Sequence, residues 1–204
     1  MNPYTVVEEL EKRIAEWAGS EYCVAVESGS AALFLSLQWV NKDGLLDGKE
    51  VTIPARTYPS VPCSIIHAGM KVRFVDFYWE GMYELEPLNI WDAALRFKRG
   101  MYQGGMQCLS GHIKKRLNIG RGGFILLDDK DAYEWLKRAR FDGRNPIPLQ
   151  QDNFVQLGWN MYLSPTDAAR GIQLFEILRD KDLPDLPFSE QNYPNLSQFK
   201  IYTQ

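Results

Sequence analysis

A buried strand followed at once by a tight turn and an apolar helix is the feature that most constrains the fold of this 204-residue chain. Residues 22–26 (YCVAV) form a short apolar run, Ser28-Gly29-Ser30 make the turn, and residues 31–37 (AALFLSL) favour a helix. The same order of strand and helix recurs further along the chain. Buried strands are predicted over 51–53, 72–77 and 124–127, and a helix over 129–140. This alternation predicts an α/β fold with a mostly parallel sheet flanked by helices.

Two further helices are marked by their first residues. Thr5 and Glu8 have the spacing of a capping box, and the apolar period that follows ends before Gly19. Ser164 is a predicted N-cap followed by a proline, so a second helix should run to about residue 180. Three prolines interrupt the rest of the chain. We therefore expect an α/β domain over residues 1–180 and an extended C-terminal arm over 181–204 that needs a surface to lie on.

Charge and composition exclude several classes of function. Hydrophobic residues make up 45% of the chain, and the net charge is −3 with basic and acidic residues mixed, so nothing indicates nucleic-acid binding. No apolar run is long enough to cross a membrane, and the chain starts without a signal-peptide pattern. Cys23, Cys63 and Cys108 are widely spaced among apolar neighbours, which favours buried thiols over disulfides. We expect a cytoplasmic protein without a metal site.

Lys115 is the strongest candidate for a catalytic residue. It lies in the segment LSGHIKKRLNIGRGG (109–123), five residues after Ser110 and five before Gly120. A lysine amine enclosed among small residues can form an imine with an aldehyde when it is unprotonated, and Ser110 could donate to a phosphate on the same ligand. A solvated surface lysine is the alternative.

The turn at Ser28-Gly29-Ser30 is a candidate phosphate site. A helix that starts directly after a strand points free backbone N–H groups at the turn, Gly29 allows close approach, and the Ser30 hydroxyl adds a donor. An ordinary helix N-cap explains the same residues.

Taken in order along the chain, these segments resemble the DegT/DnrJ/EryC1/StrS family of pyridoxal-phosphate-dependent sugar aminotransferases. The resemblance covers roughly residues 5–178 and implies the large domain of a fold-type I transferase in reduced form. Lys115 would carry pyridoxal 5'-phosphate, and Gly29, Ser30 and Ser110 would bind its phosphate.

The resemblance assigns roles to three more residues. Tyr58, in PARTY (54–58), would stack on the cofactor ring; the alternative is that it is a half-buried tyrosine of the core. Asp92 would pair with the pyridine nitrogen and keep the ring an electron sink; a helix N-cap is the alternative. Asn160, in GWNMY (158–162), would reach the phosphate in a neighbouring subunit, which implies a homodimer with shared active sites, unless it only serves its own turn.

The chain also departs from the family pattern. The connection between Asp76 and Trp91 is short, so the sheet should be smaller than in relatives, and only the arm 181–204 stands where relatives continue into a small domain. Leu95 replaces a usual glutamine or histidine and Tyr162 a usual arginine. Gly111 replaces an aromatic residue and Arg121 an acid.

Three functions follow as hypotheses. The first is an aminotransferase acting on a keto sugar, nucleotide-linked, with glutamate as amino donor. The second is a catalytically impaired relative that binds the cofactor or acts as a dimeric assembly protein. The third is an unrelated α/β protein whose turn at 28–30 binds another phosphate-bearing ligand.

Overall fold

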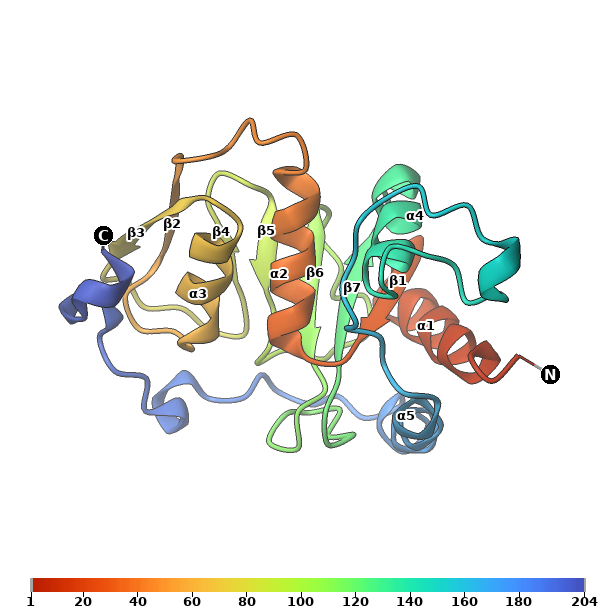
Figure 1. The fold of residues 1–204 in the computed structure, drawn as a ribbon. Coiled ribbons are helices and arrows are strands. Elements are labelled where there is room, and N and C mark those ends of the chain that lie inside the picture. Colours follow the sequence, from red (N-terminus) through yellow and green to blue (C-terminus); the bar gives the residue numbers. More distant parts are fainter. Residues whose placement is uncertain (1, 204) are drawn as a thin grey trace.

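The computed structural model describes residues 2–203 and has a layered α/β architecture (Figure 1). The helices are α1 Thr5–Ala18, α2 Gly29–Val40, α3 Ser60–His67, α4 Lys130–Ala139 and α5 Pro165–Leu178. The strands are β1 Tyr22–Val26, β2 Glu50–Pro54, β3 Lys71–Val75, β4 Tyr83–Leu85, β5 Ile90–Asp92, β6 Met106–Ser110 and β7 Gly123–Leu127. Short 3₁₀ turns lie at Leu149–Gln151, Phe188–Gln191, Leu196–Gln198 and Lys200–Tyr202.

The expected α/β fold, with helices flanking a central sheet whose strands mostly run in one direction, is confirmed, and the sheet is mixed. Its order is β1-β7-β6-β5-β4, with β5 and β6 parallel and the other neighbours antiparallel. Strands β2 and β3 form a parallel pair, which an antiparallel bridge between Thr52 and Glu86 joins to the end of β4. Strands β4 and β7 therefore run against the other five. The connection β4–β5, residues 86–89, is too short for the crossover that a parallel neighbour requires.

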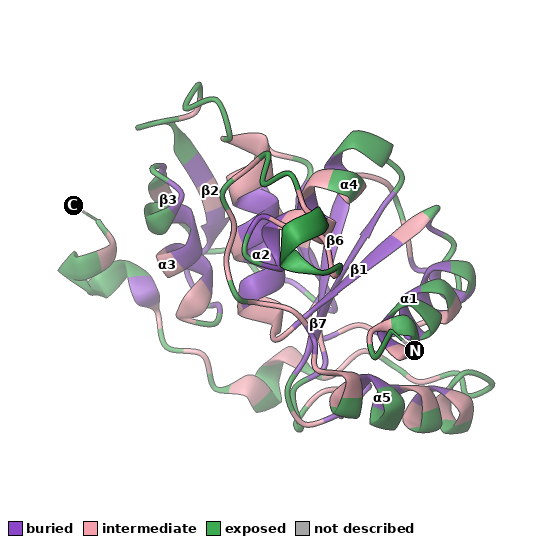
Figure 2. Cartoon of the chain, turned by 45° about the vertical axis from the view of Figure 1, so that its right-hand side comes forward, coloured by how far each residue is buried: buried purple, intermediate pink, exposed green. Residues whose placement is uncertain are grey.

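Both faces of the sheet are buried under helices. Along β1, Val24 and Val26 pack on the α2, α3 and α4 side, whereas Cys23 and Ala25 pack on the side of α1 and α5. The same alternation continues through β7, where all five residues are buried. Strands covered on both faces lose the polar alternation of a surface strand, which is why their sequences are nearly continuous apolar runs. Strands β1, β6 and β7 form the buried centre in Figure 2.

The helix ends differ in how well the sequence marks them. Ser164 caps α5 as predicted, its Oγ accepting from the Asp167 N–H at 3.1 Å. Gly19 ends α1 with a φ of 89°, also as predicted. The capping box at Thr5 is wrong: Tyr4 is the N-cap and makes no side-chain cap, while the Thr5 hydroxyl donates to the Asn2 carbonyl. Helix α5 ends at Leu178, slightly before the predicted end.

The segment after α5 crosses the lower edge of the molecule in Figure 1 and ends beside α3 and β3. Its backbone is tied to the rest of the chain near both ends. The Leu186 N–H donates to the Leu95 carbonyl at 2.8 Å, and the Leu196 N–H donates to the Ala55 carbonyl at 2.7 Å. Leu196 is buried. The surface on which this arm lies belongs to its own chain.

The cysteines are free thiols, but only two of the three are buried. Cys23 and Cys108 lie in the core, whereas Cys63 on α3 is half-buried. No helix among residues 2–203 combines the length and hydropathy that a membrane crossing requires.

Candidate cofactor site

The predicted phosphate turn and the predicted lysine segment meet at the carboxyl ends of β1 and β6. Ser28 caps α2, its Oγ accepting from the Ala31 N–H at 3.1 Å. Gly29 lies directly against Ser110: a Cβ built on Gly29 would be 3.0 Å from the Ser110 Cβ. A larger residue at position 29 would push the end of β6 away. The first turn of α2 and the serine that opens the lysine loop therefore form one surface, at the strand ends where open α/β sheets bind ligands.

The Ser30 hydroxyl has a partner within the chain. Its Oγ donates to the Ser60 Oγ at 2.7 Å, at the first residue of α3. The Ser110 Oγ accepts from the His112 N–H at 3.3 Å. The Ser110 hydroxyl still has its proton to donate, whereas the Ser30 hydroxyl can donate to a phosphate only if it releases Ser60, because a serine hydroxyl has a single proton.

Asp92 is the buried acid of the site. Its side chain accepts from the Ala94 N–H at 3.0 Å and from the Tyr83 hydroxyl at 3.0 Å. The Tyr83 hydroxyl also bonds the Thr57 hydroxyl at 2.5 Å. Burial raises the pKa of Asp92, and these hydrogen bonds together with the charge of Lys115 offset part of the rise.

Lys115 lies in the loop between β6 and β7, in electrostatic range of Asp92. Its backbone N–H donates to the His112 carbonyl at 2.8 Å, and the side chain is half-buried. Burial lowers the pKa of Lys115, the Asp92 charge raises it, and the neighbouring Lys114 lowers it again, with a net downward shift. A larger fraction of this amine is therefore unprotonated near neutral pH than for an ordinary surface lysine.

The last two predicted site residues, Tyr58 and Asn160, differ in their exposure and contacts. Tyr58 follows β2 and is 57% exposed, with one side open to a ligand. The Asn160 side chain points to the segment after α4, where its Nδ2 donates to the Asp142 Oδ2 at 3.1 Å. The structure thus brings Gly29 against Ser110 and leaves Lys115 within electrostatic range of Asp92. It turns Asn160 toward Asp142.

Aromatic residues that the sequence reading missed surround Asp92. The Trp79 ring lies 4.6 Å from the Tyr83 ring and 6.2 Å from the Tyr193 ring, measured between centroids. Trp79 and Tyr83 lie in the connection that departs from the family, and Tyr193 lies in the C-terminal arm. No spacing marks them, because aromatic residues in such segments usually fill a core.

The departures from the family pattern have local structural roles. The Tyr162 ring packs against Tyr4 and Phe141, with centroids 5.6 and 4.9 Å away. Leu95 is buried in the core, and Arg121 pairs with Glu27 at 2.9 Å. At Gly111 a Cβ would be 2.9 Å from the Ile119 side chain, so glycine makes room for Ile119.

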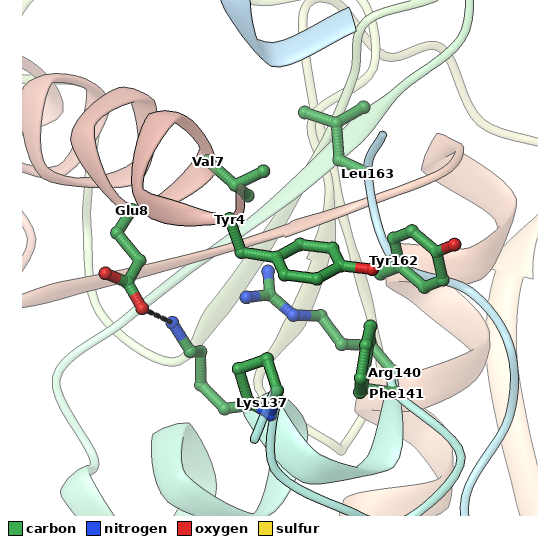
Figure 3. Close-up of a pocket in the computed structure, with 9 residues that line it drawn as sticks. Tyr4, Val7, Glu8, Lys137, Arg140, Phe141, Tyr162 and Leu163 are labelled. Atoms are coloured by element: carbon green, nitrogen blue, oxygen red, sulfur yellow. Dashed lines mark ion pairs between the residues drawn. The ribbon is translucent and has the colours of Figure 1, made fainter. Parts of the chain in front are cut away.

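A small cavity lies elsewhere, between the start of α1 and the end of α4 (Figure 3). Its volume is about 20 Å³, and Tyr4, Glu8, Lys137 and Tyr162 are among its lining residues. Glu8 and Lys137 form an ion pair across it at 4.0 Å. A cavity of this size holds about one water molecule. The predicted site residues do not line it.

Comparison with known proteins agrees with the resemblance read from the motifs. The sequence model of the DegT/DnrJ/EryC1/StrS aminotransferase family matches residues 1–95. The spore coat polysaccharide biosynthesis protein SpsC of Bacillus subtilis is 34% identical over 84 residues, which are 41% of this chain and 21% of that protein. GDP-4-keto-6-deoxy-D-mannose 3-dehydratase of Yersinia pseudotuberculosis is 38% identical over 73 residues, 34% of this chain and 19% of that enzyme. The matched part is thus about a fifth of each curated relative.

Solved structures extend the similarity in fold over most of the chain. DesV of S. venezuelae, in complex with a ketimine intermediate, has a TM-score of 0.69 at 20% identity, covering 84% of this chain and 56% of its own. A DegT DnrJ EryC1 StrS aminotransferase from Brucella abortus has a TM-score of 0.71 at 22% identity, covering 86% and 59%. The hypothesis of an unrelated α/β protein is therefore wrong. The resemblance to the DegT/DnrJ/EryC1/StrS aminotransferase family is confirmed, in sequence over residues 1–95 and in fold-type I architecture over most of the chain.

Proposed function

We propose that this chain binds pyridoxal 5'-phosphate on Lys115 and transfers an amino group from glutamate to a nucleotide-linked keto sugar. The observation that carries the proposal is that the phosphate turn at Gly29 lies against Ser110, at the start of the loop whose half-buried Lys115 is within electrostatic range of the buried Asp92 carboxylate. The family match supports the reaction class, and the relatives include a protein named for polysaccharide biosynthesis and an enzyme named for a GDP-linked keto sugar.

The residues present fit this cofactor. When bound, pyridoxal phosphate supplies an aldehyde that condenses with amines and a ring that withdraws electrons from the adjacent bond. The N-terminus of α2, with Gly29 and Ser30, and the nearby Ser110 offer donors for its phosphate. Asp92 would hold the proton on the pyridine nitrogen, and Tyr58 would lie against the ring. Lys115 would attach the cofactor and, once released, move a proton at the substrate carbon.

The test is covalent attachment of the cofactor. Purified protein mixed with pyridoxal phosphate should gain visible absorbance, and borohydride followed by peptide mass spectrometry should place the adduct on Lys115. Lys115→Ala should lose both signals. Lys114→Ala is the matched control, because Lys114 is the exposed neighbour in the same loop, and it should keep both signals. A colourless wild type without an adduct contradicts the proposal.

A second candidate is a cofactor-binding protein without turnover. It is favoured by Tyr83, which is buried and already donates to the Asp92 carboxylate. A panel of nucleotide-linked keto sugars with glutamate separates the two candidates. Attachment of the cofactor without transfer to any sugar supports the second, and one productive sugar refutes it.

We also propose that the chain acts as a homodimer in which Asn160 serves the partner's site. Support comes from exposed apolar side chains just before it in the chain, at Phe154, Val155 and Leu157, which are 57%, 59% and 89% exposed. Apolar patches of this kind favour protein contacts. Sedimentation velocity should give a dimer that Leu157→Glu weakens, with Leu45→Glu as the control at a distant exposed leucine. A monomer at every concentration contradicts the dimer.

A further inference from the structure

Residues 184–196, called the strap below, run across the carboxyl edge of the sheet beside the candidate site. In Figure 1 the segment after α5 crosses the loop between β6 and β7, which carries Lys115. The backbone hydrogen bond at Leu186 ties the strap to Leu95, three residues after Asp92, and the one at Leu196 ties it to Ala55, three residues before Tyr58. The two backbone anchors thus lie close in sequence to Asp92 and Tyr58, the residues predicted to contact the cofactor ring.

A third attachment joins the strap to the lysine loop. Arg116, adjacent to Lys115, donates from Nε to the Pro184 carbonyl at 2.9 Å and from a terminal nitrogen to the Asp185 carbonyl at 3.2 Å. The strap therefore links the segments that carry Asp92, Tyr58 and Lys115, which lie far apart in the sequence.

Asp185 holds the start of the strap by charge. Its carboxylate is 2.7 Å from Arg96 and 3.4 Å from Lys98, and its side chain is 17% exposed. Burial alone would raise the pKa of Asp185, but the hydrogen bonds and charge of Arg96, with Lys98, lower it. The carboxylate therefore stays ionised and paired at neutral pH.

Between its anchors the strap presents Tyr193 to the site. The Tyr193 ring stacks on Trp79 with an interplanar angle of 15°, and Trp79 packs on Tyr83, whose hydroxyl bonds Asp92. Burial raises the pKa of the Tyr193 phenol, and the charges of Asp92 and Tyr58 raise it further. The phenol is thus within electrostatic range of both predicted ring partners, the acid and the stacking aromatic.

We infer that the strap is the outer wall of the candidate site and that Tyr193 is a further residue that contacts the bound cofactor. The inference rests on the proposed function, since it assigns a contact to the same ligand. Tyr193 is linked to Asp92 through the Trp79 and Tyr83 rings, and the strap is anchored three residues from both Asp92 and Tyr58, so a ring placed between these two residues would lie beside the strap.

The experiment measures the affinity for pyridoxal phosphate by absorbance titration of the full chain. Tyr193→Ala should weaken binding about tenfold, the size expected for losing one aromatic contact with its buried area. Tyr193→Phe keeps the ring and should stay within about threefold of wild type. Tyr202→Ala is the matched control: Tyr202 is also in the C-terminal arm but packs on Phe74, outside the strap, and should stay within about twofold.

A second measurement reports on the strap without using absorbance. Asp185→Asn weakens the charged anchor and should increase amide hydrogen exchange in residues 184–196 and in the loop 112–117, while Asp182→Asn, at an exposed aspartate nearby, should not. Adding pyridoxal phosphate to the wild type should slow exchange in the strap.

The outcomes separate the two proposals. If the wild type fails to bind pyridoxal phosphate, the proposed function is wrong, and so is the inferred contact of Tyr193 with the cofactor. If the wild type binds and Tyr193→Ala binds within twofold of it, only the inference is overturned. Circular dichroism establishes that each variant is folded. Should Tyr193→Ala unfold, hydrogen exchange of the wild type still decides: no slowing in residues 184–196 on addition of pyridoxal phosphate overturns the inference.

Discussion

At the scale of single residues, Asp92, the buried acid of the candidate site, lowers the stability of the fold. Asp92 is only 5% exposed, and burial raises its pKa above the ordinary value of 3.8 despite three favourable contacts. A carboxyl group whose pKa is higher in the folded protein than in the unfolded chain makes folding less favourable once it is ionised. Retaining such a group in the core is common at functional sites, where activity and stability conflict.

Asp92→Asn should therefore leave the protein at least as stable as wild type at pH 7 while it weakens cofactor binding. The asparagine removes the buried charge, so the advantage should shrink as the pH falls through the folded pKa of Asp92, where the wild-type carboxyl becomes neutral. Urea unfolding at several pH values measures this difference. Asp76→Asn, at an exposed carboxylate, is the control. A clear loss of stability at pH 7 would show that the hydrogen bonds from Tyr83 and Ala94 outweigh the burial cost.

At the scale of elements, α5 is the helix that its own sequence specifies best. Ser164 is its N-cap, a proline occupies the first turn, and Asp167 both donates its N–H to the Ser164 Oγ and accepts from that hydroxyl at 2.8 Å. The helix then packs on α1, where Phe175 meets the edge of the Trp17 ring at 5.7 Å. The helix is thus fixed both locally and by packing.

Ser164→Ala should lower the free energy of unfolding by about 1 kcal/mol, because the Asp167 N–H loses its partner. Thr166→Ala, at the exposed second residue of the same helix, should change it by less than about 0.5 kcal/mol. Urea denaturation of both variants tests the difference. Equal effects would mean that packing on α1, rather than the cap, fixes the start of α5.

At the scale of the whole molecule, a buried ion cluster joins α1, β1 and α4. Glu11 is 4% exposed, and its carboxylate accepts from the Ala25 N–H at 2.8 Å, from Lys137 at 3.2 Å and from Arg140. Arg140 also donates to the Ala25 carbonyl. The cluster fixes α1 and α4 against the first strand of the sheet, which leads into the phosphate turn.

Glu11→Ala should cost about 3–5 kcal/mol of stability, because it leaves the Arg140 charge buried without its partner. Glu9→Ala breaks an exposed pair with Arg13 on the same helix and should cost less than about 1 kcal/mol. Chemical unfolding monitored by circular dichroism compares the two. A Glu11→Ala cost no larger than that of Glu9→Ala would contradict a structural role for the cluster.

The sequence by itself determined the elements whose information is local. Continuous apolar runs mark β1 and β7, since strands covered on both faces need apolar side chains at nearly every position. Ser28 and Ser164 mark the starts of α2 and α5, because a hydroxyl can satisfy the free N–H groups of a first turn. The family motifs also located the turn at Gly29 and the lysine loop at Ser110, which meet in the structure.

Tertiary structure alone decided the direction of the strands and the surroundings of Asp92. A strand of three residues such as β4 carries too little pattern to be predicted. It nevertheless runs antiparallel to β5 and places the Tyr83 hydroxyl in hydrogen-bonding contact with Asp92. Likewise, the prolines of the last segment predict only that it is extended. That the segment folds back and stacks Tyr193 on Trp79 depends on contacts between residues far apart in the chain, and these leave no periodic trace in the sequence.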